Sequence, residues 1–229
     1  MNWLFYNFDL IGKLTIEHLR LAIPPIILGF LISIPLGWLA YRYRLTRGLL
    51  LTIAGLLYTI PSLALLPILP VILGISFLSP LNLTVALTIY AVAIMARSIA
   101  DALTSVDPAV RQAATAMGYG AWRRFWAVEF PLAGPVVLAG VRVAAVSTIS
   151  LVTVGALIGV ESLGYLFTNG YQRTIVAEIL TGVVMVVVIA LVVDFLLARL
   201  GRVLMPWAPR RQRRARAGAV SVPVVGGAA

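Results

Sequence analysis

The sequence predicts an all-α membrane protein with about five transmembrane helices, and two observations carry that prediction. Of its 229 residues, 61% are hydrophobic and 11% are charged, and the mean hydropathy is +1.02. Soluble domains average roughly 45–50% apolar and about 25% charged residues. The apolar residues also gather in repeated runs near the roughly 20 residues that a helix needs to cross a bilayer. A single membrane domain therefore accounts for most of the chain.

Five apolar runs are long enough to be spans, and their composition predicts helices. A transmembrane β-barrel needs polarity that alternates along segments of about ten residues. The run GVVMVVVIALVV at 182–193 does not alternate, and only helices or closed barrels satisfy the backbone in lipid. The expected spans are Leu21–Tyr41, Leu49–Leu73, Leu81–Leu103, Pro131–Gly159 and Ile175–Leu197.

Terminal segments are predicted on either side of a transmembrane domain at 21–199. Residues 1–20 interleave aromatic and polar side chains and lack the basic and apolar regions of a cleavable signal. We expect them to lie at the membrane interface. Residues 200–229 begin with an arginine block and end in Gly, Pro, Val and Ala. We expect this tail to be disordered and attracted to anionic lipids, or alternatively to dock a partner.

Arginine placement predicts the orientation of the bundle, because loops that stay in the cytoplasm carry an excess of Lys and Arg. Most arginines fall on one side of the predicted spans, and the other side holds only Lys13, Arg20 and Arg173. The N-terminus is therefore expected outside and the C-terminus inside. The net charge of +10 is scattered between apolar runs rather than gathered in a continuous stripe, so no nucleic-acid partner is expected. The expected cytoplasmic arginines are Arg42, Arg44, Arg47, Arg111, Arg123, Arg124 and those within 199–216.

Prolines interrupt the second expected span. Pro61, Pro67 and Pro70 each remove a backbone donor and free carbonyl groups. Membrane proteins tolerate this where neighbouring helices or a wet cavity satisfy those groups. The second span is therefore a candidate wall of a translocation path, with Pro61, Ser62 and Tyr90 as its candidate residues. The alternatives are a kinked helix that only packs and a tyrosine that only anchors the protein at the interface.

The longest polar interruption, residues 105–130, predicts two short helices. Asp107 can cap the first helix, Pro108 can begin it because its missing amide proton is not needed there, and Gly118 can end it. Mostly small residues at i, i+3, i+4 and i+7 form one narrow face that allows close packing. These residues are Val110, Ala113, Ala114 and Met117.

The second short helix, expected from Ala121 to Phe130, has an interfacial pattern. Pro131 is expected to break it from the fourth span. One face of this helix carries Trp122, Phe125, Trp126 and Glu129. Taken alone, the pair of helices is equally compatible with a connector that lies on the membrane surface.

One motif resembles the cytoplasmic signature of bacterial binding-protein-dependent ABC importer permeases. It consists of QAATAMG at Gln112–Gly118, then arginines, then FPLAGPVVLAGVR at Phe130–Arg142. The family pattern reads Glu-Ala-Ala, three residues, Gly, about nine residues, then a hydrophobic residue, any residue, Leu and Pro. Gln112, Ala113, Ala114 and Gly118 take the motif positions, and Phe130 and Pro131 take its end. Gln112 replaces the usual Glu, so a salt bridge from this position is not expected.

Three further stretches are similar to the glycine betaine, carnitine and choline permeases, the osmoprotectant branch of that family. They are TIPSLALLPIL at 59–69, ARSIADALTSVDPAVRQAA at 96–114 and GALIGVESLGYL at 155–166. Val160, Glu161 and Ser162 depart from the small residues that this branch favours. An importer permease for another small solute, such as an amino acid, therefore stays open.

The resemblance implies a transport subunit of a bacterial cell membrane, multi-pass and without catalytic residues. Its coupling helix would dock onto a separate ATP-binding subunit, which would hold the ATP and Mg. An extracytoplasmic substrate-binding protein and a second permease subunit, identical or different, complete the expected partners. No phosphate-binding loop surrounds the single lysine, Lys13, and neither a cofactor nor a metal is expected in this chain. The implied coupling residues are Asp107, Gln112, Ala113, Ala114, Met117 and Gly118.

Two other classes of protein compete with this interpretation. A secondary transporter would show inverted repeats and acidic residues at mid-membrane, and a structural or assembly protein would not need the ordered polar segment. We expect an ion pair between Arg97 and Asp101, which lie four residues apart. Three further charged residues, Arg142, Glu178 and Asp194, are expected near span ends. The only histidine, His18, is expected before the first span with no cluster of partners that would indicate a metal site or catalysis.

Overall fold

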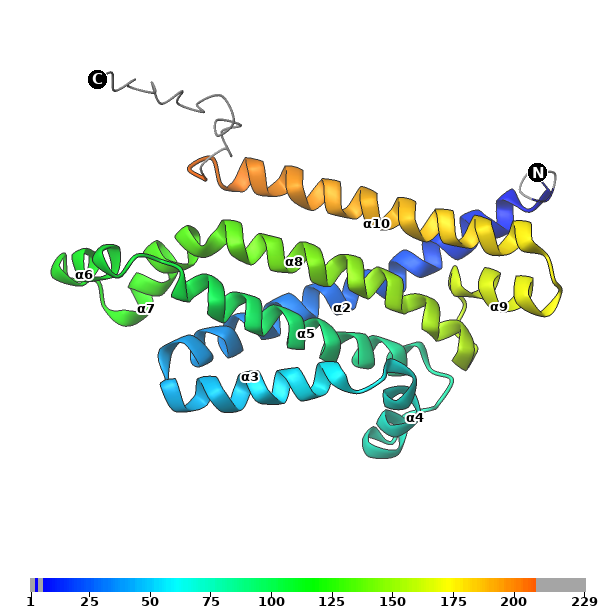
Figure 1. Cartoon of the computed structure of the whole chain (residues 1–229), viewed down its shortest axis with the longest axis horizontal. Coiled ribbons are helices and arrows are strands. Elements are labelled where there is room, and N and C mark those ends of the chain that lie inside the picture. Colours follow the sequence, from blue (N-terminus) through cyan, green and yellow to red (C-terminus); the bar gives the residue numbers. More distant parts are fainter. Residues whose placement is uncertain (1–2, 4–5, 209–229) are drawn as a thin grey trace, which may run out of the picture.

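A computed structural model describes residue 3 and residues 6–208, apart from the side chain of residue 44. All regular elements in these residues are helical, and the long helices lie along one axis of an elongated bundle (Figure 1). The elements are α2 (Phe8–Arg42), α3 (Arg44–Thr59), α4 (Ser62–Leu73), α5 (Pro80–Thr104), α6 (Pro108–Ala116), α7 (Ala121–Arg124), the π-helical η1 (Phe125–Glu129), α8 (Phe130–Val152), the 3₁₀-helical η2 (Thr153–Ile158), α9 (Gly164–Gln172) and α10 (Val176–Leu204).

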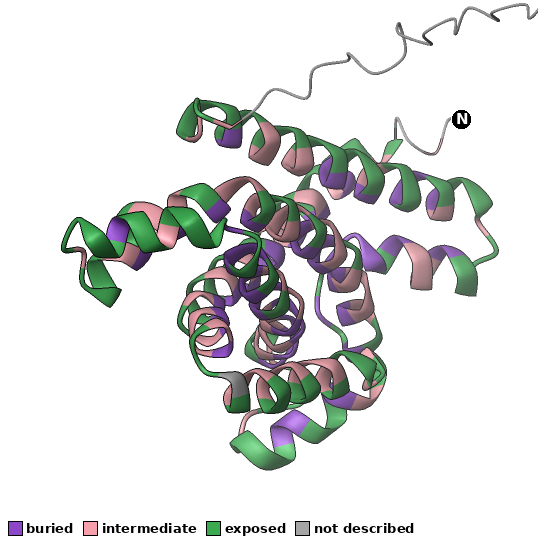
Figure 2. Ribbon diagram, turned by 60° about the vertical axis from the view of Figure 1, so that its left-hand side comes forward, coloured by how far each residue is buried: buried purple, intermediate pink, exposed green. Residues whose placement is uncertain are grey.

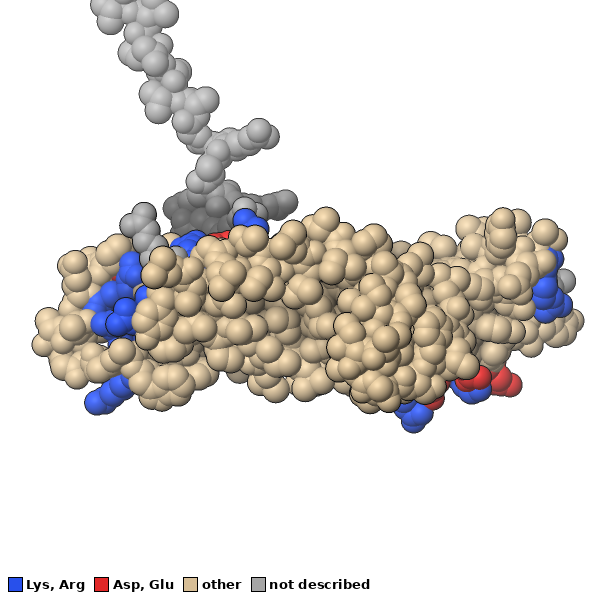
Figure 3. Space-filling model, turned by 90° about the horizontal axis from the view of Figure 1, so that it is seen from below, with Lys and Arg blue, Asp and Glu red and all other residues tan. Residues whose placement is uncertain are grey.

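The helical membrane fold predicted from composition is confirmed. Among the described residues, four helical stretches are long and apolar enough to cross a bilayer, namely α2, α5, the continuous stretch Ala121–Ile158 and α10. The α3 and α4 pair adds a fifth if it is counted as one span, although it is bent by 108°. The face drawn in Figure 3 carries its charged side chains toward the two ends, with a broad uncharged band between them. Such a band matches the hydrocarbon layer of a membrane.

Helix α5 forms the centre of the bundle, and α2, α3 and α8 pack around it. Figure 2 shows buried positions at the centre and exposed positions on the rim. Small residues allow α2 to approach α5 closely. A Cβ atom on Gly29 would lie 2.5 Å from the Cβ of Ala91, and one on Gly37 would lie 2.6 Å from the Cγ2 of Ile99. Close approach matters in lipid, where helices associate through packing rather than through the hydrophobic effect.

No break in the helix marks the expected boundary between an interfacial segment and the first span at Arg20. Helix α2 runs unbroken for 35 residues from Phe8, about 52 Å at 1.5 Å per residue. Leu14 and His18 are buried, so this early part of the helix packs against the bundle. Residues 8–20 therefore belong to the same helix as the first span, their interfacial location stays a prediction, and Pro24, Pro25 and Pro35 lie inside the helix without ending it.

The second half of the chain departs from expectation in three places. The expected fourth span comprises α8 followed by η2, and α10 extends to Leu204, beyond the expected end at Leu197. Helix α9, which the sequence analysis did not anticipate, lies between these spans, and Thr174 after it has a positive φ of 57°. Most of the basic tail, residues 209–229, lies outside the described residues, and so do the predictions of its disorder and of its lipid contact.

Candidate functional site

The first half of the polar segment folds as its capping residues predict. The Asp107 carboxylate accepts a 2.8 Å hydrogen bond from the backbone N–H of Ala109, and Pro108 begins α6. The helix ends at Ala116, and Gly118 then adopts a left-handed conformation with φ of 84°. In this region glycine has no steric penalty, whereas a side chain is strained. The predicted cap and stop are therefore confirmed.

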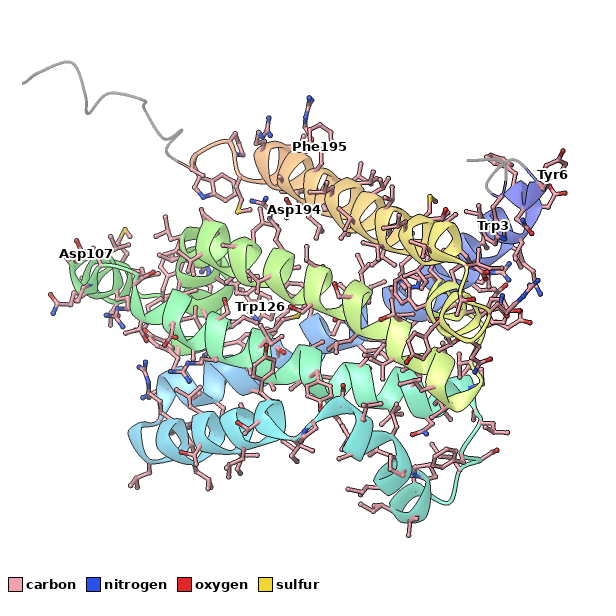
Figure 4. All side chains as sticks on the ribbon, turned by 45° about the vertical axis from the view of Figure 1, so that its right-hand side comes forward. Trp3, Tyr6, Asp107, Trp126, Asp194 and Phe195 are labelled. Carbon is pink, nitrogen blue, oxygen red and sulfur yellow. The ribbon has the colours of Figure 1, made fainter. Side chains whose placement is uncertain are left out.

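Helix α6 projects from one end of the bundle, the end opposite the N-terminus (Figure 1). Figure 4 shows Asp107 at that end, far from Trp3 and Tyr6. The four residues expected on one packing face differ in burial within this chain. Only Ala114 is buried, at 1% exposure, whereas Met117 is 70% exposed and Ala113 is also exposed. Within this chain only Ala114 is covered by the bundle, and the close packing of the other three residues against a partner stays a prediction.

Helix α7 does not end before the fourth span, so the expected break at Pro131 is wrong. The helix passes through η1 into α8 as one continuous stretch. A proline ring crowds the carbonyl four residues earlier and supplies no amide proton. The π-helical turn removes this conflict, because the N–H of Phe130 bonds to the carbonyl of Phe125, five residues back.

The π turn also creates an ion pair that an α-helical register would not favour. Arg124 Nε lies 2.6 Å from the carboxylate of Glu129, five residues later, and Glu129 is only 2% exposed. The expected face shared by two tryptophans with Phe125 and Glu129 is accordingly split. Phe125 and Glu129 are buried, whereas Trp122 and Trp126 are exposed. Sequence reasoning missed this pair because charged side chains are normally matched at spacings of three or four.

Two arginines fasten α6 to the rest of the bundle. Arg124 Nη1 donates a 2.7 Å hydrogen bond to the hydroxyl of Thr115 on α6. Arg111 on α6 donates to the hydroxyl of Tyr41, near the end of α2, and its guanidinium lies 5.6 Å from the centre of that ring. Because α6 is held from two sides, a displacement of α6 would be transmitted to the long helices.

The break in the second span falls at Pro61, one of the three candidate path residues. Helix α3 ends at Thr59 and α4 begins at Ser62, which is half-buried. The hydroxyl of Tyr90 donates to the carbonyl of Ile60 directly before the proline. Tyr90 is 4% exposed, so it is no interfacial anchor. It lies against the break and satisfies a carbonyl there.

The expected pair of Arg97 with Asp101 does not form. Asp101 lies 3.1 Å from Arg47 of α3 instead, and Arg47 also donates to Thr104 at 3.1 Å. Both acceptors belong to α5, so this contact ties the start of α3 to the end of α5. Spacing along α5 suggested a local pair, whereas the packing of a second helix supplies a better placed partner.

Arg142 and Asp194 do not lie near helix ends as expected. Two parallel hydrogen bonds of 2.6 Å join them, from Nε and Nη2 of Arg142 to the two carboxylate oxygens. Figure 4 shows Asp194 on the side of α10 that faces α8. Because α10 continues to Leu204, Asp194 lies about 15 Å from that end. The pair therefore links α8 to α10 at a partly exposed position between the ends of the two helices.

Two further polar side chains have partners that the sequence did not reveal. His18 is fully buried, with Nε2 3.0 Å from the carbonyl oxygen of Ile149 on α8. Glu178 is also fully buried and accepts a 2.6 Å hydrogen bond from the side-chain amide of Asn169 on α9. Within the described part of the chain, no three His, Cys, Asp or Glu side chains gather in a way that could hold a metal ion.

Comparison with known proteins places these features in one family. A family model described as "Binding-protein-dependent transport system inner membrane component" matches residues 33–208. An osmoprotectant import permease protein of Salmonella typhimurium is 34% identical, over 90% of this chain and 97% of that protein. A carnitine transport permease protein of Listeria monocytogenes is 32% identical, over 87% of this chain and 90% of that protein. A choline transport system permease protein of Bacillus subtilis is also 32% identical, over 84% and 87%.

Solved structures share the same fold at lower identity. A chain of the MetNI methionine ABC transporter, in inward-facing conformations, matches with a TM-score of 0.76 at 24% identity, over 86% of this chain and 97% of that one. A chain from an amino acid ABC transporter with histidines matches with a TM-score of 0.69 at 15% identity, over 89% and 96%. At these identities the likeness concerns the fold alone.

Proposed function

Because this chain belongs to the family of binding-protein-dependent transport system inner membrane components, we propose that it moves a quaternary-ammonium osmoprotectant across the membrane. The chain is a multi-pass transport component and not an enzyme. Glycine betaine, choline and carnitine are the candidate solutes. The energy would come from ATP hydrolysis by a partner subunit that holds the ATP and Mg.

The proposed substrate class rests on the solutes named for the relatives of this chain. Three curated permeases for osmoprotectants, carnitine and choline share 32–34% identity with this chain over most of its length. The amino acid alternative rests on solved structures at 24% and 15% identity. Those identities support a common fold and do not favour an amino acid as the solute.

The coupling role is proposed for α6 and the residues around it. The segment fits this role because it projects from the bundle, exposes much of its surface and is fastened through Arg111 and Arg124. A rigid element of this kind transmits a displacement from a docked ATPase to the long helices. The proposed coupling residues are Asp107, Gln112, Ala113, Ala114, Met117 and Gly118. Gln112 would contribute hydrogen bonds and no charge.

The translocation path is proposed along the broken second span. Non-helical backbone at membrane depth is tolerated where it is covered by protein or lines a wet cavity. Pro61, Ser62 and Tyr90 lie at this break, and the break gives α3 and α4 different directions. The path would be completed by a second permease subunit, and the solute would be delivered by an extracytoplasmic substrate-binding protein.

Reconstitution tests the whole proposal. The chain, its ATP-binding subunit and its substrate-binding protein would be placed in proteoliposomes, and uptake of radiolabelled glycine betaine, choline, carnitine, methionine and histidine would be measured. We expect uptake of one or more of the first three solutes, dependent on ATP and unaffected by a protonophore. Uptake of an amino acid only would contradict the substrate class. Uptake driven by an ion gradient without ATP would favour a secondary transporter.

A further inference from the structure

A cavity of about 720 Å³ lies between the end of α2 and the coupling segment. Three arginines from three different helices line it, Arg42 of α2, Arg111 of α6 and Arg124 of α7, and no Asp or Glu is among the lining residues. We call this cavity the arginine pocket. Its other lining residues are Tyr41, Pro108, Gln112, Thr115 and Ala116.

The positive charge of the arginine pocket is only partly neutralised. Arg124 pairs with Glu129. Arg42 and Arg111 form no ion pair with any described residue. The residues outside the described part contain no Asp or Glu that could supply another partner. Two guanidinium groups therefore remain available for an anion that enters the pocket.

The guanidinium groups are held in place before any ligand arrives. Arg111 is fixed by the hydroxyl and the ring of Tyr41, and Arg124 is fixed by Glu129 and Thr115. Arg42 lies over the ring of Tyr43, 5.4 Å from its centre. A planar guanidinium presents paired donors that match two oxygens of a phosphate. Preorganised donors also lower the entropic cost of binding.

Aromatic side chains beside the arginine pocket indicate its depth in the membrane. Trp38 lies one turn before the pocket on α2, with its ring centre 6.3 Å from that of Trp122. Trp122 and Trp126 are exposed. Exposed tryptophans at the end of a membrane bundle mark the level of the lipid headgroups. The phosphates of a bilayer lie at that level, whereas soluble phosphates and nucleotides reach the pocket only from the aqueous phase.

We propose that the arginine pocket binds a phosphate group, supplied by the headgroup of an anionic phospholipid. Arginine pockets between helix ends are suited to such headgroups because each basic residue near the surface attracts anionic lipid. A headgroup in this position contacts α2 and α6 at once. It therefore strengthens the attachment of the coupling segment to the bundle and links that attachment to the charge of the membrane.

Lipid retention by the purified full-length chain tests this proposal. Bound phosphatidylglycerol and phosphatidylcholine would be counted by native mass spectrometry. The double variant Arg42→Gln/Arg111→Gln would be compared with Arg20→Gln/Arg173→Gln, which removes the same charge from exposed positions outside the pocket and outside the basic tail. We expect the wild type and the control to prefer phosphatidylglycerol. The pocket variant should lose that lipid by about 30-fold, because each charge contributes about fivefold.

Other results would overturn the proposal in distinct ways. Equal retention of phosphatidylglycerol by the two double variants would show that the arginine pocket does not bind the lipid. If inorganic phosphate binds the delipidated protein and displaces bound phosphatidylglycerol, the ligand is a soluble phosphate and not a lipid headgroup. Unchanged lipid retention together with lost ATPase association would assign the arginines to an acidic surface of that subunit. These readouts do not depend on transport, so they stand apart from the proposed substrate.

A folding control keeps the test decisive. Thermal unfolding would be measured for both double variants, and Arg111→Lys, which keeps the charge, should retain most of the lipid. If the pocket variant does not fold, Arg42→Gln replaces it, because that guanidinium lies over the neighbouring Tyr43 ring and forms no ion pair with any described residue. This single change should weaken phosphatidylglycerol retention about fivefold. Retention equal to that of the wild type would overturn the proposal.

Discussion

At the scale of single residues, Tyr90 illustrates how one hydroxyl stabilises a broken helix. At the break the N–H of Ala64 bonds to the carbonyl of Pro61, which leaves the carbonyl of Ile60 without this helical partner, and an unpaired polar group in lipid costs several kcal/mol. The Tyr90 hydroxyl supplies a donor to the carbonyl of Ile60 beside Pro61. The ring of Tyr58 packs edge-on against Tyr90, with ring centres 6.3 Å apart.

Removing this hydroxyl should destabilise the protein. In Tyr90→Phe the ring remains and the carbonyl of Ile60 loses its donor, at a cost of about 1–3 kcal/mol. We expect the melting temperature of the purified protein to fall by roughly 3–10 °C. Tyr58→Phe is the matched control, since Tyr58 is exposed and no hydrogen bond from it is recorded. Equal melting temperatures for the two variants would show that the contact has no stabilising effect.

A second prediction at this scale concerns the ion pair between α8 and α10. Removing one partner leaves an uncompensated charge beside the apolar helices α8 and α10, which is unfavourable in a membrane, whereas an apolar pair is often neutral. Arg142→Leu should therefore yield little folded protein in detergent, as measured by size-exclusion chromatography. The double variant Arg142→Leu/Asp194→Leu should recover most of the yield. If the double variant is no better than the single one, the pair has a role other than mutual neutralisation.

At the scale of helices, local signals predicted one half of the polar segment and failed in the other. Capping at Asp107 and the stop at Gly118 depend on neighbouring residues only, so the sequence revealed both. The continuous passage through Pro131 depends on a π-helical turn. The pattern of apolar residues does not predict such a turn, because the π-helical turn forms where a helix continues through a proline.

The left-handed turn at Gly118 yields a prediction for coupling. Gly118→Val places a branched side chain at a φ of 84°, where L-residues are strained by about 1–2 kcal/mol. We expect the exit of α6 to shift and ATP-dependent uptake to fall at least tenfold, with membrane insertion intact. Gly120→Val is the matched control, because Gly120 has no positive φ and open space around it. Normal uptake by Gly118→Val would contradict the coupling role of the segment.

The first long helix shows a signal that sequence reasoning overlooked. Gly29, Ser33 and Gly37 recur every four residues on α2, and each is buried. This spacing puts small residues on one face, which is typical of helices that approach closely in membranes. The face packs against α5, where Ala91 and Ile99 fill the space that side chains would take. The pattern was available in the sequence, but its partner helix was not.

At the scale of the whole molecule, the arginine bias makes a prediction about orientation. The chain contains no cysteine, so a single introduced cysteine can be labelled without background. Ala116→Cys on α6 should react with a membrane-impermeant maleimide only in inverted vesicles. Tyr171→Cys, at a highly exposed position on α9, should react with the same maleimide in cells whose cytoplasmic membrane is intact and whose outer face is accessible to the reagent. Labelling of both positions from the same side would contradict the proposed topology.

The sequence by itself determined the membrane class, the approximate spans, and the cap and stop of α6 at Asp107 and Gly118. These follow from composition, run length and residues adjacent in the chain. Tertiary structure alone decided which partner each polar group found: Asp101 with Arg47, Arg142 with Asp194, His18 with a carbonyl of α8. The physical reason is that an apolar interior leaves each buried polar group in need of a partner, and the partner is set by which helices pack together. The arginine pocket has the same origin, since its three charges come from separate helices.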